Sequence, residues 1–193
     1  AISIAKFTYE VKKEVEGPLG PEQTSMIADL LEKYKRRELA PPSTDDYQSL
    51  RIKPTNERLS VKRHDSDYYL IDKNTGESFL IELKIGGDLD NKKARSEKEA
   101  LLEQFAILSN VLPSEKKVRI FFATAYNRYG EDKPWKQERV RQFFADEELL
   151  IGRDFWNFIC NSKDGYETVL DAYKENANLI TSALDSIKQT YLD

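Results

Sequence analysis

The stretch that decides the fold covers residues 67–84 and reads DYYLIDKNTGESFLIELK. It contains two runs rich in β-branched and aromatic residues, 67–72 and 77–85, and such runs are typical of strands. The link between them, 73–76, contains the Asn and Gly residues that tight turns favour. We therefore expect these two runs to form an antiparallel hairpin.

The centre of the turn sets which residues of the hairpin face each other. If it lies between Asn74 and Thr75, the numbers of paired residues sum to 149, and Asp67 faces Glu82. Residues opposed in this way have Cβ atoms about 4.5–5.5 Å apart. Two carboxylates that close repel each other unless a cation lies between them, and a hard divalent cation with oxygen ligands is suited to that place. An odd-length loop that ends at Gly76 would shift the sum to 150 and separate the two carboxylates.

The second run places two charged side chains on one face. Glu82 and Lys84 are two residues apart and share the side of Leu80, while Phe79 and Ile81 point to the other side. Charged groups on an otherwise apolar strand cost free energy if they are buried without partners. A Glu-Leu-Lys pattern alone is common on protein surfaces, so the opposed aspartate is what makes this pair a candidate catalytic site.

The rest of the chain predicts a mixed sheet flanked by helices. A helix is expected over 21–40 and another over 94–108, because apolar residues recur at helical spacing in both. A modest strand signal covers 59–64, a buried strand is expected over 118–125, and helices follow from residue 135, with breaks near 152 and near 164–165. The sequence thus predicts one α/β domain over 1–193 with a helical part at about 126–193.

Composition excludes several classes of protein. The single cysteine, Cys160, rules out an intrachain disulfide framework, and one Cys with one His, His64, rules out an ordinary zinc site. No apolar run approaches the roughly 20 residues that cross a bilayer, so we expect no membrane partner and a cytoplasmic location. The net charge is −4, but residues 116–141 contain eight basic and three acidic residues. This uneven charge suits the binding of a polyanion by the middle of the chain, and ordinary solvated surface charge is the alternative.

The hairpin resembles the signature of the PD-(D/E)XK nuclease superfamily. Asp67 is followed by fourteen residues and then by Glu82-Leu83-Lys84, and Ser66 stands where the motif usually has Pro. The expected order of helices and strands also resembles that fold, a mixed central sheet flanked by helices with a helical C-terminal part.

This resemblance implies that residues at about 20–125 form the catalytic core. It also implies hydrolysis of DNA phosphodiester bonds with Mg²⁺, for which Mn²⁺ can substitute. Asp67, Glu82 and Lys84 would be the catalytic residues, and the metal ligands would be Asp67, Glu82 and the carbonyl of Leu83. Two alternatives for the first carboxylate stay open, Asp65 and, as the weaker one, Asp72.

Two further segments resemble type II restriction endonucleases of the TdeIII type. The first is 88–92, DLDNK, directly after the hairpin, and the second is YNRYG at 126–130 together with LLIGRDFW at 149–156. This resemblance implies sequence-specific cleavage of double-stranded DNA by a homodimer. A structure-selective or repair nuclease, and a catalytically inert DNA-binding or assembly module, are the alternatives.

Basic and amide side chains near these segments are candidates for DNA contact. Those at the start of the helix after the hairpin are placed to meet phosphates, and those in the loop after the buried strand lie among aromatic residues. The alternatives are a polar helix start and an ordinary exposed loop. The candidates are Asn91, Lys92, Lys93, Arg95, Arg128, Lys133 and Lys136.

Overall fold

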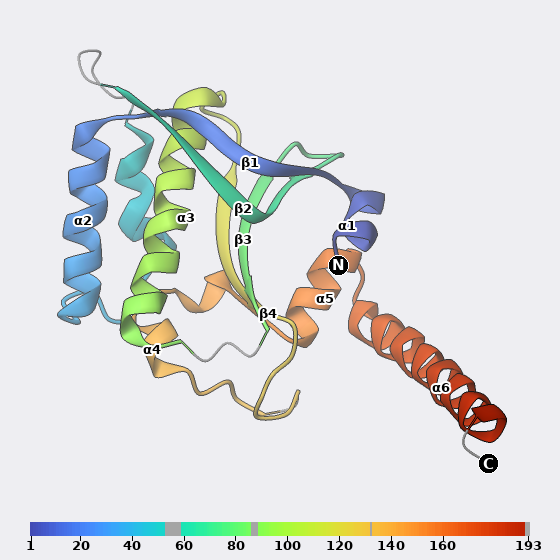
Figure 1. Ribbon diagram of the computed structural model, residues 1–193. Coiled ribbons are helices and arrows are strands. Elements are labelled where there is room, and N and C mark those ends of the chain that lie inside the picture. Colours follow the sequence, from blue (N-terminus) through green and yellow to red (C-terminus); the bar gives the residue numbers. More distant parts are fainter. Residues whose placement is uncertain (53–58, 86–88, 132, 192–193) are drawn as a thin grey trace.

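The computed structural model describes residues 1–52, 59–85, 89–131 and 133–191. Its elements follow one another along the chain as Figure 1 shows. They are α1 (Ile2–Thr8), β1 (Tyr9–Leu19), α2 (Pro21–Lys35), the 3₁₀ helix η1 (Thr44–Arg51), β2 (Ser60–Asp72), β3 (Ser78–Lys84), α3 (Asn91–Val111), β4 (Val118–Thr124), α4 (Glu138–Arg141), the 3₁₀ helix η2 (Asp146–Glu148), β5 (Leu149–Ile151), α5 (Arg153–Cys160) and α6 (Gly165–Tyr191).

The five strands form one mixed sheet in the order β1-β2-β3-β4-β5. β1, β2 and β3 are antiparallel neighbours, whereas β3, β4 and β5 run parallel. A parallel connection needs a crossover, and α3 provides it between β3 and β4. The predicted class, a mixed sheet flanked by helices, is confirmed.

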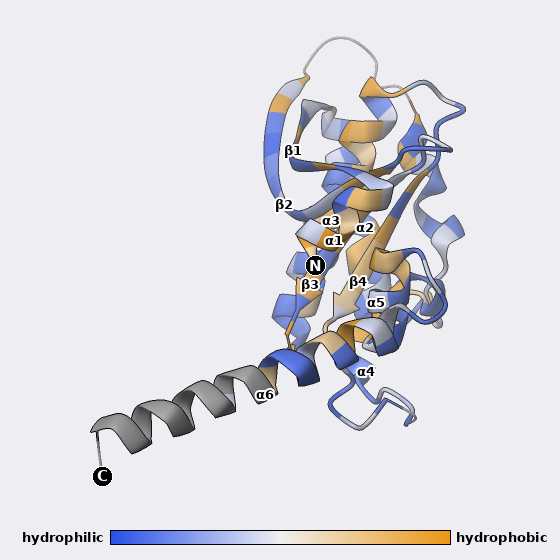
Figure 2. Cartoon of the chain, turned by 90° about the vertical axis from the view of Figure 1, so that its right-hand side faces the viewer, coloured by the Kyte–Doolittle hydropathy of each residue, from blue (hydrophilic) through white to orange (hydrophobic). Residues whose placement is uncertain are grey.

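Two apolar layers hold the helices on the sheet. Alternate side chains of a strand point to opposite faces, so Leu80 of β3 packs with α2 and α3, while Phe79 and Ile81 pack with α1 and α5. Figure 1 shows α2 and α3 on one side of the sheet and α1 and α5 on the other. In Figure 2, β4 is apolar over most of its length, as expected for a strand covered on both faces.

Sequence reasoning misplaced the strands on the N-terminal side. β2 is one strand of 13 residues, where two separate signals at 59–64 and 67–72 were expected. Its pairing with β1 shifts so that residues 66–68 lie opposite Lys13 alone, and this irregularity interrupts the alternation along β2. β1 was not expected, because its half-exposed face carries the charged residues that masked a strand pattern.

The breaks predicted near 152 and near 164–165 are present, since α5 begins at Arg153 and α6 at Gly165, but the helix predicted from 135 to the first break was wrong. α4 has four residues, and the following segment forms η2 and the short strand β5 at the edge of the sheet. Phe143 and Phe144 are buried after α4, so tertiary packing overrides the helical pattern there. Among the described residues, no helix is long and apolar enough to cross a membrane.

Candidate active site

The turn between β2 and β3 fixes the register of the hairpin. The Asp72 carboxylate accepts hydrogen bonds from the backbone N–H groups of Asn74 and Thr75, each at 2.8 Å. Gly76 has φ +70°, a conformation that glycine adopts without steric cost, and its N–H donates to the Asp72 carbonyl. These bonds from backbone N–H lower the pKa of Asp72. Asp72 therefore builds the turn, at the far end of the hairpin from Glu82.

This turn gives the register that brings Asp67 to β3. Paired residues run from Ile71 with Ser78 to Tyr68 with Ile81, so their numbers sum to 149. One further step places Asp67 opposite Glu82. There the Asp67 carboxylate accepts a hydrogen bond from the backbone N–H of Leu83 at 3.0 Å. At the end of the β2–β3 pairing, the carboxylate of Asp67 thus accepts the hydrogen bond of a β3 backbone N–H that a backbone carbonyl would otherwise accept. This contact holds Asp67 beside Glu82.

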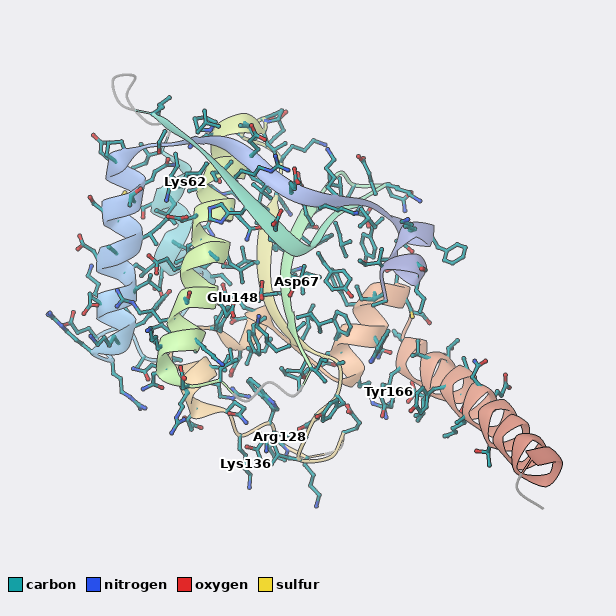
Figure 3. The ribbon with its side chains drawn as sticks, in the orientation of Figure 1. Lys62, Asp67, Arg128, Lys136, Glu148 and Tyr166 are labelled. Atoms are coloured by element: carbon teal, nitrogen blue, oxygen red, sulfur yellow. The ribbon has the colours of Figure 1, made fainter. Side chains whose placement is uncertain are left out.

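Asp65 lies in a different position. It is paired with Glu14 of β1, on the far side of the irregularity at 66–68. Bulges of this kind often lie next to active sites, where they redirect a side chain. Of the two carboxylates, Asp67 is the one whose contact with β3 the structure records, which favours it as the first acidic residue. Figure 3 shows Asp67 at the sheet.

The structure also places an ammonium group between two carboxylates. Lys84 Nζ forms an ion pair with Glu82, two residues before it on β3, and a second with Glu97 Oε1 at 2.9 Å. Glu97 is on α3, which covers this face of the sheet. The side chains are sheltered, with exposed fractions of 29 % for Lys84, 15 % for Glu82 and 22 % for Glu97. The site is therefore a charged cluster at the carboxyl end of β3.

Burial and neighbouring charge shift the pKa values of this cluster. The pKa of Glu82 is raised to about 7, mainly by burial and in smaller part by the negative charges of Glu97 and Asp67, while the hydrogen bond and the charge of Lys84 oppose the shift. Burial lowers the pKa of Lys84, but its hydrogen bonds to Glu82 and Glu97 outweigh burial, so the net shift is upward. The lysine is held charged, and the site carries an excess of negative charge that a cation would relieve.

The raised pKa of Glu82 predicts a dependence of stability on pH. The folded protein holds this proton more tightly than the unfolded chain, so the free energy of unfolding falls as pH rises from the ordinary value of 4.5 through about 7. In metal-free buffer at about pH 8, the free energy of unfolding of Glu82→Gln should exceed that of the wild type by on the order of 1–3 kcal/mol. At about pH 4 the two proteins should have similar free energies of unfolding. Urea denaturation across this range measures the difference.

The control for this prediction is Glu99→Gln, which changes an exposed glutamate of the same helix that carries Glu97. This variant should follow the wild type at every pH. If Glu82→Gln also followed the wild type, the burial of a charged Glu82 would be contradicted.

Glu97 is a residue of this cluster that sequence reasoning missed. A signal was present, because Glu97 and Lys98 lie within the helical spacing that joins the buried residues Ala94 and Leu101. Charged residues on the buried face of an amphipathic helix need partners in the fold. The sequence does not say which partners they find, since those of Glu97 and Lys98 lie on other elements.

Lys98, the next residue of α3, finds its partner in η2. The side chain of Lys98 is fully buried, and that of Glu148 is 1 % exposed. The ammonium group lies 2.6 and 2.7 Å from the two carboxylate oxygens. The rings of Tyr47 and Phe144 surround it at 4.8 and 4.9 Å from the ring centres. Glu148 also accepts a hydrogen bond from the backbone N–H of Ala145. This buried pair joins α3 to η2.

The candidate DNA-binding residues fall into two places. Asn91, Lys92 and Arg95 line one pocket at the start of α3, whereas Lys93 lies outside its lining. The others, Arg128, Lys133 and Lys136, are exposed on the loop between β4 and α4. Figure 3 shows Arg128 and Lys136 near the carboxyl end of β3, where the charged cluster lies. The fold thus brings both groups to the same end of the sheet.

The donor set fits a hard divalent cation. Mg²⁺ is usually held by one or two carboxylates, with water and substrate phosphates completing its shell. Asp67 and Glu82 supply two carboxylates beside each other, and the pKa of Glu82 is raised by burial and, in smaller part, by the negative charges of Glu97 and Asp67. Within the part of the chain that the structure describes, no three His, Cys, Asp or Glu side chains converge as metal ligands. The arrangement therefore favours an ion shared with a phosphate over a site closed by protein ligands.

Comparison with known proteins gives one match. A family model described as "Type II restriction endonuclease, HinfI" matches residues 1–177. No curated protein and no solved structure matches the chain. The matched family is a restriction endonuclease family, but its description does not name the TdeIII type, so that narrower prediction is not confirmed.

Proposed function

This chain belongs to the HinfI family of type II restriction endonucleases, and from this premise we propose that it hydrolyses phosphodiester bonds of double-stranded DNA at a specific sequence, with Mg²⁺ as cofactor. The observation that carries the proposal is the cluster at the end of β3. Two opposed acidic residues, Asp67 and Glu82, lie beside an ammonium group that is held charged. That combination of groups is suited to cleaving a phosphodiester.

The metal ion is proposed to be held by Asp67, Glu82 and the carbonyl of Leu83. When bound, a divalent ion polarises the scissile phosphate and lowers the pKa of a water molecule in its shell. Mn²⁺ accepts the same oxygen ligands and is expected to replace it. The chain's own contribution is to fix the two carboxylates in register, through the turn at Asp72 and the contact of Asp67 with Leu83.

Lys84 is proposed to orient the attacking water and to offset negative charge that develops on the phosphate. Positive charge placed in advance at that point costs no rearrangement during the reaction. Glu97 acts as a positioning residue, because its carboxylate holds Nζ of Lys84 from the side of α3 at 2.9 Å. Without this second partner, the ammonium group would be held by Glu82 alone, which is also a proposed metal ligand.

The proposed DNA contacts surround this cluster. The loop between β4 and α4 carries Arg128, Lys133 and Lys136, and Arg128 lies over the aromatic ring of Tyr129. Such a mixture of basic and aromatic side chains is suited to contact with phosphates and bases. Lys93 and its neighbours Asn91, Lys92 and Arg95 begin α3 on the other side. We propose a homodimer as the active form, because a palindromic site has two equivalent strands that a two-fold pair of chains can cut.

A plasmid digest tests the proposed function. Discrete fragments that require Mg²⁺ and disappear with EDTA are the expected result. A smear would indicate a nuclease without sequence specificity, and preference for free ends or junctions would indicate a structure-selective or repair nuclease. If every DNA tested stays intact, the chain is an inert binding module, and the proposal is contradicted.

The choice of the first carboxylate gives a specific prediction. Asp67→Asn should lower the rate of cleavage by at least about 100-fold, because the amide keeps the shape of the side chain but removes the negative charge that holds the metal ion. Asp65→Asn is the matched control, since it makes the same change two residues away on the same strand, and its rate should stay within a few-fold of the wild type. The rates are measured on plasmid DNA with saturating Mg²⁺. The reverse order of effects would assign the metal ion to Asp65.

A further inference from the structure

A pocket with cationic walls lies between α2, α3 and the segment after α4. Its volume is about 350 Å³, and its lining consists of Lys35, Asn91, Lys92, Arg95, Gln142 and Phe143. Three of these six side chains are cationic and two are amides, and no carboxylate among the described residues lines the pocket. We call it the α2–α3 pocket. Its composition favours an anion as occupant.

Neighbouring carboxylates cancel only part of this positive charge. Glu32 is in contact with two of the three cations, at 3.0 Å from Arg95 and 3.7 Å from Lys35. Asp90 accepts a hydrogen bond from the backbone N–H of Lys93 and so caps α3. The structure records no ion pair for Lys92 within the residues it describes. The walls thus retain positive charge after Glu32 is counted.

Arg95 offers the exposed part of its guanidinium group to an anion. Its side chain is 34 % exposed, and its recorded ion pair with Glu32 is made through Nη2. Guanidinium groups bind phosphate oxygens through their N–H donors.

The base of the pocket is fixed by packing. Phe143 is 1 % exposed and lies against the ring of Tyr34, with the ring centres 6.5 Å apart. Gln142 donates from its side-chain amide to the backbone carbonyls of Tyr34 and Lys35. This contact holds the end of α2, and with it the backbone of Lys35, against the segment after α4.

The pocket lies close to the active site along α3. Arg95 reaches α2, whereas Glu97 reaches Lys84 on the sheet, so the pocket and the active site flank the first turns of this helix. Glu97 is six positions after Asn91, which corresponds to a rise of roughly 9 Å along an α-helix. Successive base pairs of DNA are about 3.4 Å apart, so this distance corresponds to two or three nucleotides.

We propose that the α2–α3 pocket binds a phosphate of the DNA backbone a few nucleotides from the scissile bond, with Lys35, Lys92 and Arg95 as its cationic contacts. This inference rests on the proposed function and adds a site to it. Lys35 brings α2 into the binding surface, which no motif in the sequence indicated. The pocket would set how far the DNA strand extends past the active site, and it would contribute affinity without reading the sequence.

The salt dependence of DNA binding tests this proposal. The parent is the Lys84→Ala protein in Mg²⁺, which keeps the DNA uncut, and its affinity for a labelled duplex is measured by fluorescence anisotropy. Loss of one phosphate contact reduces the slope of log affinity against log salt by about 0.9. When salt is raised from about 50 to about 200 mM, the affinity of the parent for DNA falls by a certain factor. For Lys35→Ala and for Lys92→Ala, this factor should be about 3 to 4 times smaller.

Lys33→Ala is the matched control, because it removes the same charge from the same helix two residues from Lys35, and Lys33 does not line the pocket. Its slope should equal that of the parent. Unchanged slopes for Lys35→Ala and Lys92→Ala would overturn the pocket proposal and leave the proposed function standing. The pocket proposal would fall even if inorganic phosphate were found to bind in the pocket. A parent that binds no DNA would overturn the proposed function as well.

Discussion

Lys84→Ala is expected to lose DNA cleavage by about 10²- to 10³-fold while it keeps DNA binding within a few-fold of the wild type. Removing one group that stabilises developing charge in a transition state has an effect of this size. In this protein the group is held by carboxylates on two elements, Glu82 on β3 and Glu97 on α3. Single-turnover cleavage and anisotropy on the same duplex measure the two effects separately.

Two further variants show whether Lys84 acts through its position. Glu97→Gln should reduce the rate by a smaller factor, because Lys84 keeps its ion pair with Glu82. Lys33→Ala removes a lysine of α2 outside the site and should cleave as fast as the wild type. Turnover by Lys84→Ala within tenfold of the wild type would contradict the assignment of this lysine to the reaction.

The second large effect concerns stability and falls on the buried pair of Lys98 and Glu148. Lys98→Met should lower the free energy of unfolding by about 3–5 kcal/mol, because it leaves a charge at a site 1 % exposed with no ionic partner. Urea denaturation of the metal-free protein measures this loss. Lys33→Met, an exposed change of the same kind on α2, should stay within about 0.5 kcal/mol of the wild type.

A double variant separates the pair from general disruption of the core. Lys98→Met combined with Glu148→Gln removes both charges, while the amide oxygen of the glutamine can still accept from the N–H of Ala145. Replacing both members of a buried ion pair is far less costly than removing one, so we expect most of the loss to be recovered. A double variant less stable than Lys98→Met alone would contradict this account.

The buried pair also bears on the active site through α3. Lys98 follows Glu97 directly, so the contact of Lys98 with η2 and the contact of Glu97 with Lys84 fix the same turn of the helix from two sides. The chain thus uses one helical turn for a structural ion pair and for positioning a proposed catalytic lysine.

The hairpin could be predicted from the sequence because its determinants are local. Asp72 and Gly76 lie within the turn they build, and the register follows from the position of that turn. Glu82 and Lys84 share a face because side chains of a strand alternate. Of the two pairing sums that the sequence left open, 149 and 150, the structure has 149, and this register brings Asp67 to β3.

The remaining parts of the site depend on contacts between distant elements. Glu97 lies on a helix whose rotation about its axis is set by packing, so the sequence shows a charged residue on a buried face but not its partner. Lys35 joins Lys92 and Arg95 only because α2 packs against α3 and the segment after α4. Likewise β5 has three residues, too few for a strand pattern to be seen before β4 provides its partner.

If Asp67 and Glu82 hold a divalent ion beside Lys84, anomalous scattering from a crystal soaked in Mn²⁺ should locate that ion. We expect a peak between these two carboxylates, within about 2.0–2.3 Å of an oxygen of each, and close to the carbonyl of Leu83. A peak bound by other side chains, with none at Asp67 and Glu82, would show that these residues do not form the metal site.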